Sequence, residues 1–195
     1  ARFLAESYGC RVTGIDLTAE YVEVADMLSR RCGLDRLTGF QVANALDLPF
    51  GDGVFDLAWT QNVSMNLPDK KAFFDSIFRV LRPGGKLSSS EVVTGDAEEP
   101  VYPLPWAREP SINFAVPADA MKTALEVAGF RLLDWQDTTA DAVAVFQNPG
   151  QAARRGKLGV GLVAGADFGE RSANLAHGMA DGRFASVMFV AERPA

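Results

Sequence analysis

The sequence is poor in the residues from which disulfides, metal sites and histidine-based catalysis are built. Its 195 residues include two cysteines, Cys10 and Cys32, and a single histidine, His177. Two cysteines are too few for a disulfide framework, and neither they nor the carboxylates have the spacing of a metal site. No apolar run approaches the length of a membrane span, and the first residues do not resemble a signal peptide. We therefore expect a cytoplasmic protein without a metal centre or a membrane partner.

An excess of positive charge is also missing. The chain carries 19 Lys and Arg against 25 Asp and Glu, which gives a formal net charge of −6. Long-range electrostatics therefore disfavour a nucleic acid or another polyanion as a partner. A small molecule that is neutral or cationic is easier to accommodate. Nothing in the sequence indicates the oligomeric state.

Segments typical of strands and of helices alternate along the chain, which has the length of one domain. Hydrophobic spacing and glycine stops predict helices at 1–8, 18–32, 69–81, 117–128, 140–147 and 168–180. Similar signals predict strands at 11–17, 39–43, 55–60, 86–93, 131–135 and 184–192. This alternation indicates an α/β fold with a Rossmann-like, doubly wound, mostly parallel sheet. We expect helices on both faces, an antiparallel last strand and a single domain over residues 1–195.

Residues 94–116 differ from the rest of the chain. They contain four prolines and no hydrophobic periodicity, together with Tyr102, Trp106 and Phe114. Long irregular insertions in compact domains are often binding loops or lids. The three aromatic residues could form an apolar wall that excludes water from an acceptor pocket and attracts a cationic group. They could equally pin the loop onto the sheet.

The residues most able to bind a ligand lie at the carboxyl ends of the predicted strands, because doubly wound sheets bind ligands there. Asp16 ends the first strand and can accept hydrogen bonds from both vicinal hydroxyls of a ribose, with Leu17 lying against an adenine. The plainer interpretation is an acid on a solvated turn before a helix.

Two further strand ends carry polar groups. Asn44, Ala45 and Leu46 follow the strand at 39–43 and could contact the edge of an adenine, or form a plain turn. Gln61 and Asn62 follow the strand at 55–60 and could hold the amino-acid end of a cofactor, or simply cap the chain. Each of these signals is weak when taken alone.

The order and spacing of these segments resemble the class I S-adenosylmethionine-dependent methyltransferases that act on small molecules. VTGIDLTAEYVEVA resembles the second strand and helix of that family, ALDLPFGDGVFDLAW its adenine-side loop and fourth strand, and FRVLRPGGKL the start of its fifth strand. The similarity covers about residues 2–130. It is nearest to the branch that contains sarcosine and dimethylglycine methyltransferases and quinone C-methyltransferases.

The resemblance implies S-adenosylmethionine as the cofactor and assigns its adenosine end to the first strands. Asp16 would bind the ribose hydroxyls, and Leu17 would pack on the adenine. Asn44 stands where the family usually has an aspartate, although an amide oxygen can accept the same hydrogen bond. Ala45, followed by Leu46, would present its backbone to the ring.

The resemblance places the methionine end of the cofactor at Gln61 and Asn62. Asn66 falls near the acceptor, where several relatives carry a histidine, so that candidate base is lacking here. His177 is expected to face solvent on its helix, and no catalytic residue is identified. The sequence therefore favours methyl transfer by positioning, to a small-molecule acceptor whose identity it does not reveal.

The most diagnostic element of the family, a first strand followed by a glycine-rich loop, does not occur in the sequence. It should precede Ala1 and pair between the strands that carry Asp16 and Trp59. Because its loss would expose two rows of unpaired backbone groups, we expect the natural polypeptide to extend upstream.

Two other functions fit parts of the sequence. A Rossmann-like enzyme that uses a dinucleotide also places an acid after its second strand. A methyltransferase-like scaffold without catalysis would explain the missing glycine loop and the asparagine at Asn66. Binding of NADH or of S-adenosylhomocysteine distinguishes the three possibilities.

Overall fold

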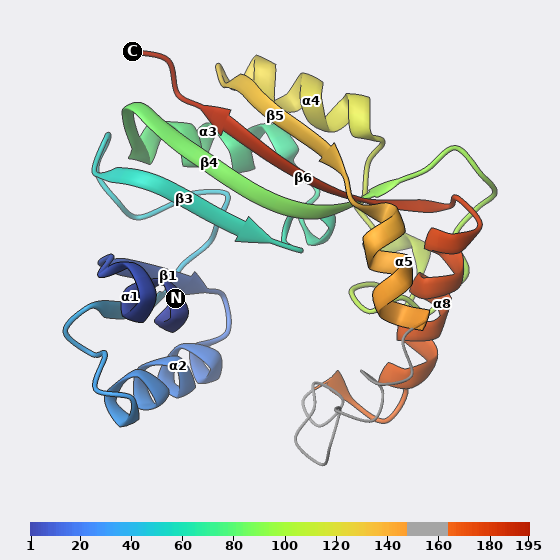
Figure 1. Cartoon of the computed structure of the whole chain (residues 1–195), viewed down its shortest axis with the longest axis horizontal. Helices are drawn as coiled ribbons and strands as arrows, with labels where there is room; N and C mark the ends of the chain where they lie inside the picture. The colour runs from blue at the N-terminus through green and yellow to red at the C-terminus, as the bar shows by residue number, and fades with distance from the viewer. Residues whose placement is uncertain (148–163) are drawn as a thin grey trace. The chain divides into compact units, whose positions relative to one another are not determined.

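The computed structural model describes residues 1–147 and 164–195, which form two compact units, Ala1–Gly51 and Asp52–Ala195. The first unit contains α1 (Arg2–Tyr8), β1 (Val12–Asp16), α2 (Ala19–Arg31) and β2 (Thr38–Val42). Strands β1 and β2 pair in parallel, and α2 packs on them (Figure 1). Each element lies within one or two residues of its predicted bounds.

The second unit is built around a four-stranded sheet in the order β3–β4–β6–β5 (Figure 1). Its strands are β3 (Phe55–Gln61), β4 (Leu81–Thr94), β5 (Arg131–Asp137) and β6 (Phe184–Glu192). Its helices are α3 (Lys70–Val80), α4 (Ala118–Val127), α5 (Thr139–Gln147) and α8 (Phe168–Ala180), with short 3-10 turns at Ser64–Asn66 and Pro110–Ile112. The pair β3–β4 is parallel, and β6 is antiparallel to both neighbours. The predicted α/β fold with an antiparallel last strand is confirmed.

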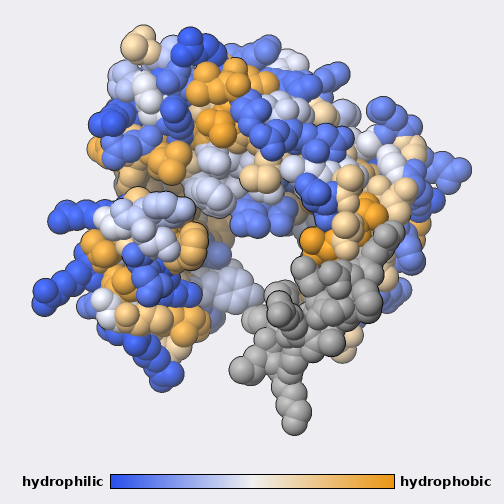
Figure 2. Space-filling model, viewed as in Figure 1, coloured by the Kyte–Doolittle hydropathy of each residue, from blue (hydrophilic) through white to orange (hydrophobic). Residues whose placement is uncertain are grey.

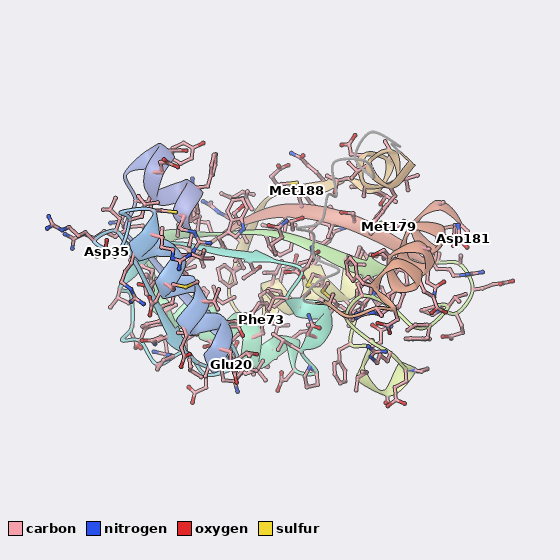
Figure 3. All side chains as sticks on the ribbon, turned by 90° about the horizontal axis from the view of Figure 1, so that it is seen from below. Glu20, Asp35, Phe73, Met179, Asp181 and Met188 are labelled. Carbon is pink, nitrogen blue, oxygen red and sulfur yellow. The ribbon has the colours of Figure 1, made fainter. Side chains whose placement is uncertain are left out.

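The strand register separates the two faces of this sheet. Leu87 and Glu91 of β4 and Phe189 of β6 lie on one face and are almost completely buried, on the side where α3 and α4 pack. Met188 lies on the opposite face from α3, as the edge-on view shows (Figure 3). That side chain is 41% exposed, and Trp59 on the same face is 53% exposed. Apolar residues are visible among polar ones on the surface of the molecule (Figure 2).

The segment Arg82–Gly85 forms a bulge inside β4. Leu81 pairs with Phe55, and the ladder resumes only at Lys86. Gly84 has a φ of 75°, which favours glycine. A Cβ on Gly85 would lie 2.8 Å from the carbonyl oxygen of Arg82. The backbone therefore requires both glycines.

His177 is exposed on α8, as its helical position predicts. The side chain of Thr18, which precedes α2, makes no capping hydrogen bond. Asp16 instead accepts a hydrogen bond from the backbone N–H of Thr18. None of the helices within the described residues has the length and hydropathy of a membrane-spanning segment.

Arg193 joins the end of β6 to the end of α3. Its Nη1 atom donates to the carbonyl oxygens of Phe78, Arg79 and Leu81 at 2.9, 3.0 and 2.7 Å. Its guanidinium also lies 4.8 Å from the centre of the Phe78 ring. These carbonyls at the end of a helix have no partner within the helix itself, so a cation from another element satisfies and stabilises them.

Arg193→Ala should lower the free energy of unfolding by about 2 kcal/mol, because hydrogen bonds to a charged group and a cation–π contact are lost together. Urea denaturation measures the change. Arg82→Ala is the matched control, since it removes only an exposed ion pair with Asp56 and should cost less than about 0.5 kcal/mol. Equal losses for the two variants would contradict the capping role of Arg193.

Candidate functional site

The first unit brings two predicted strand ends to the same edge of its sheet. Asp16 is the last residue of β1, and its carbonyl oxygen accepts a hydrogen bond from Ala43 N–H at 3.0 Å, just after β2. The Asp16 carboxylate is exposed, and its Oδ1 accepts the backbone N–H of Thr18 at 2.8 Å. This bond orients the carboxylate and leaves its second oxygen to accept from a hydroxyl group. Leu17 beside it is 66% exposed.

Asn44, Ala45 and Leu46 form a tight turn at that edge. The Asn44 side-chain oxygen accepts from Leu46 N–H at 3.0 Å, and its carbonyl oxygen accepts from Asp47 N–H at 3.1 Å. Ala45 and Leu46 are half-buried, whereas Asn44 is exposed. The turn therefore presents one amide side chain to solvent beside the end of β1, which is the type of group that can contact a nucleobase edge.

In the second unit, Gln61 and Asn62 follow the carboxyl end of β3. Gln61 is exposed and pairs with Ser90, and Asn62 N–H donates to the Ser90 carbonyl at 2.8 Å. Asn62 has a φ of 53°, the left-handed conformation that asparagine tolerates better than most residues. The extended backbone of β3 therefore ends at Gln61.

Asn66 closes the turn that Asn62 opens. Its Nδ2 atom donates to the carbonyl oxygens of Asn62 and Val63 at 3.4 and 3.3 Å. The neighbouring Met65 carbonyl accepts from Phe114 N–H at 3.0 Å. The structure therefore places Asn66 and Phe114, two of the residues predicted to lie near an acceptor, on adjoining segments.

A buried carboxylate that the sequence reasoning missed lies directly behind this turn. Glu91 of β4 is 1% exposed, and it accepts hydrogen bonds from Val63 N–H at 3.1 Å and Ser64 N–H at 3.0 Å. Burial raises the pKa of its carboxyl, and the hydrogen bonds from Ser64 and its other neighbours oppose that rise. A lone charged residue in the otherwise uncharged stretch SSSEVV was the available signal.

Lys70 ties the irregular segment to the same region. Its ammonium donates to the carbonyl oxygens of Leu67 and Phe114 at 2.5 and 2.7 Å. Burial lowers the pKa of this ammonium, while the negative charges of Glu91 and Asp69 oppose the effect. The segment 94–116 is thus attached to the start of α3 by a half-buried cation.

Asn113 holds the aromatic residues of the segment 94–116 together. Its side-chain oxygen accepts from Trp106 Nε1 at 2.9 Å, and its nitrogen donates to the Tyr102 hydroxyl at 2.8 Å. Trp106 packs edge-on against Phe184 of β6, with ring centroids 5.4 Å apart. Tyr102 and Trp106 therefore contact the apolar cluster of the second unit, and Phe114 is held through its backbone.

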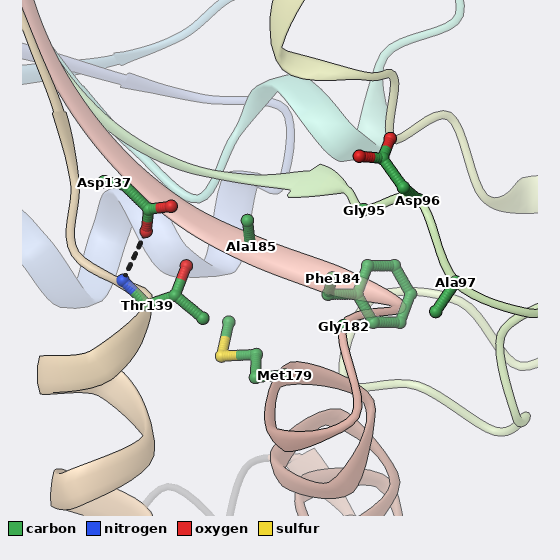
Figure 4. Close-up of a pocket in the computed structure, with 9 residues that line it drawn as sticks. All are labelled: Gly95, Asp96, Ala97, Asp137, Thr139, Met179, Gly182, Phe184 and Ala185. Carbon is green, nitrogen blue, oxygen red and sulfur yellow. Dashed lines mark hydrogen bonds between the residues drawn. The ribbon is translucent and has the colours of Figure 1, made fainter.

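An open hollow lies where β4 ends and β6 begins (Figure 4). Met179 and Phe184 form its apolar floor, and Asp96 and Asp137 stand at its rim. Asp137 accepts a hydrogen bond from Thr139 N–H at 2.8 Å. None of the residues predicted for the cofactor or the acceptor lines this hollow. The part of the chain that the structure describes also has no group of three or more His, Cys, Asp or Glu side chains arranged for a metal ion.

Glu91 should make the free energy of unfolding depend on pH. Because burial raises the pKa of its carboxyl above the ordinary 4.5, the folded state binds the proton more tightly than the unfolded state does. Its contribution to the free energy of unfolding is therefore most favourable below that value, and it declines as the pH rises through the raised pKa.

The measurement is urea unfolding of the native protein and of Glu91→Gln between about pH 4 and 8. The free energy of unfolding of the native protein, minus that of the variant, should fall with rising pH and then level off. A difference that stayed constant, or rose, across this range would show that burial does not perturb Glu91.

Comparison with known proteins shows which family the chain is similar to. Residues 1–89 match a family model described as "Methyltransferase domain". The chain is 34% identical over 96 residues to a sarcosine/dimethylglycine N-methyltransferase of Halorhodospira halochloris, covering 49% of this chain and 34% of that protein. It is 30% identical over 148 residues to a 2-methyl-6-phytyl-1,4-hydroquinone methyltransferase of Synechocystis, covering 72% and 45%.

A solved structure supports the fold. The [4+2]-cyclase SpnF superposes with a TM-score of 0.77 and 25% sequence identity, and the match covers 100% of this chain and 71% of the cyclase. The chain spans only about a quarter to a half of the length of the curated relatives that it matches.

Proposed function

We propose that this chain, whose residues 1–89 belong to the methyltransferase-domain family, takes part in transfer of a methyl group from S-adenosylmethionine to a small-molecule acceptor. The family match carries the proposal. Relatives that are themselves named methyltransferases support it, and one of these similarities extends over 72% of the chain.

The exposed edge of the first unit suits the adenosine end of the cofactor. Asp16 offers a carboxylate that Thr18 orients and that has an oxygen left for ribose hydroxyls. Leu17 offers an exposed apolar side chain on which an adenine ring can lie. Asn44, with Ala45 and Leu46 in the same turn, offers an amide and backbone groups for the edge of the base.

The turn after β3 in the second unit suits the methionine end. Gln61 and Asn62 supply two amide side chains at the hydrogen-bonded end of the strand. Asn66 lies at the other end of this turn, and its neighbour Met65 is hydrogen-bonded to the segment 94–116. We propose that Tyr102, Trp106 and Phe114 in that segment form an apolar wall of the acceptor site. We also propose that residues 1–195 act as one methyltransferase domain.

Methyl transfer requires little of the protein beyond the correct placement of the cofactor and the acceptor. An electron pair of the acceptor forms a bond to the methyl carbon, the carbon–sulfur bond breaks, and its electrons stay on sulfur to give S-adenosylhomocysteine. The chain's own contribution is to hold both reactants in line and to exclude water. We assign no residue as a general base. The two unpaired cysteines, Cys10 and Cys32, support a reducing, cytoplasmic setting.

Asp16→Asn should weaken binding of S-adenosylhomocysteine by roughly 10- to 100-fold, because a hydrogen bond to a charged acceptor contributes about 1.5–3 kcal/mol. Isothermal titration calorimetry measures the affinity. Asp35→Asn is the matched control, since it neutralises an exposed aspartate of the same unit and should change the affinity by less than about twofold. If Asp16→Asn binds S-adenosylhomocysteine as tightly as the native protein does, Asp16 does not bind the ribose.

The decisive experiment follows a labelled methyl group. The full-length protein is incubated with methyl-labelled S-adenosylmethionine and with acceptors that offer an amino-acid nitrogen, a quinone ring carbon, a phenol or an aliphatic hydroxyl. We expect one class to become labelled, with one S-adenosylhomocysteine formed for each methyl transferred.

Other outcomes would redirect the assignment. Binding of NADH without binding of S-adenosylhomocysteine would indicate a dinucleotide-dependent enzyme. No binding of S-adenosylhomocysteine at millimolar concentration would indicate a scaffold. Binding without transfer would point to another reaction on this fold, which the similarity to a [4+2]-cyclase makes a specific alternative.

A further inference from the structure

Glu91 lies at the point where backbone pairing between β3 and β4 stops. The last ladder bond joins Asn62 N–H to the carbonyl of Ser90 at 2.8 Å. The next two backbone N–H groups, those of Val63 and Ser64, have left the strand, and the Glu91 carboxylate accepts both at 3.1 and 3.0 Å. A side chain of β4 thus continues the pairing that its backbone can no longer provide.

The two oxygens of this carboxylate have separate partners. Oε2 accepts the two backbone N–H groups and also the Ser64 hydroxyl at 2.8 Å. Oε1 lies 3.2 Å from the Thr60 hydroxyl and 3.1 Å from the Ser89 hydroxyl, and these hydroxyls lie 2.7 Å from each other. Both ends of the turn, Thr60 before it and Ser64 within it, are therefore attached to one side chain.

Burying an acid at this position carries a cost, because the charged form loses its hydration. An apolar residue would pack here without that cost, but it would leave the N–H groups of Val63 and Ser64 without an acceptor. What the carboxylate secures is the path of the chain between Gln61 and Asn66, including the left-handed conformation of Asn62.

We propose that Glu91 is a positioning residue for the methyl-transfer site: it holds the turn 62–66 so that Gln61, Asn62 and Asn66 meet the cofactor and the acceptor. The inference rests on the proposed function. Glu91 itself touches no reactant, because only 1% of its surface is exposed. It acts through the backbone of Val63 and Ser64.

Glu91→Leu is the direct test, with affinity for S-adenosylhomocysteine as the readout at a temperature where each variant is fully folded. We expect the dissociation constant to rise about tenfold or more, because a small displacement of positioning groups is costly. Leu87→Ala is the matched control. Leu87 is fully buried on the same face of β4, so this variant loses stability while its affinity should change less than about twofold.

Two milder variants separate hydrogen bonding from mere packing. Glu91→Gln keeps an oxygen for the backbone N–H groups, and its amide nitrogen can donate to the hydroxyls of Thr60 and Ser89. Its dissociation constant should stay within about threefold of the native value. Ser64→Ala removes only one donor to Oε2 and should weaken binding by about threefold. Ser64→Ala keeps the test available if Glu91→Leu does not fold.

The outcomes distinguish this inference from the proposed function. If the native protein binds S-adenosylhomocysteine and Glu91→Leu binds it as well as Leu87→Ala does, the positioning role is wrong and the proposed function stands. Native affinity in Ser64→Ala, or a Glu91→Gln variant as impaired as Glu91→Leu, would also overturn the hydrogen-bonding role. If the native protein does not bind S-adenosylhomocysteine, both proposals fail.

Discussion

In the second unit, the turn after β3 depends on one carboxylate, which accepts the hydrogen bonds that a neighbouring strand would otherwise accept. Where β3 leaves the ladder, Glu91 accepts two backbone N–H groups that would otherwise be buried without partners. The turn fixed in this way carries Asn62 and Asn66, and its Met65 carbonyl anchors Phe114. Glu91 therefore holds the strand end and the turn directly, and the turn holds the irregular segment through the Met65 carbonyl.

The sequence predicted most elements because their signals are local. Glycine stops, a β-branched run before Asp16 and helical spacing are each visible within a short window. Except for β4, which begins at Leu81 rather than Lys86, the structure follows them within one or two residues. The roles of Glu91 and Asn113 were not predictable in this way. Apart from Ser89, the partners of Glu91 lie 27 to 31 residues away in the chain, and Asn113 acts by linking two aromatic residues that show no periodicity. Which residues of the candidate site bind a ligand stays a prediction.

The fold alone does not decide the reaction. Sheets of this architecture carry many activities, and chemistry resides in the groups at the strand ends. The family match and the named relatives favour methyl transfer, whereas the similarity to a [4+2]-cyclase shows that a related framework can carry a different reaction. The acceptor class therefore has to come from experiment.

The place of β6 has a consequence for how the second unit is made. This strand lies between β4 and β5, so those two strands have no shared edge until it is inserted. Arg193, just beyond it, also completes the end of α3. During synthesis, β4 and β5 emerge from the ribosome long before their common neighbour. Until β6 is made, one edge of β4 and one edge of β5 have no hydrogen-bonding partner, a state that chaperones commonly protect.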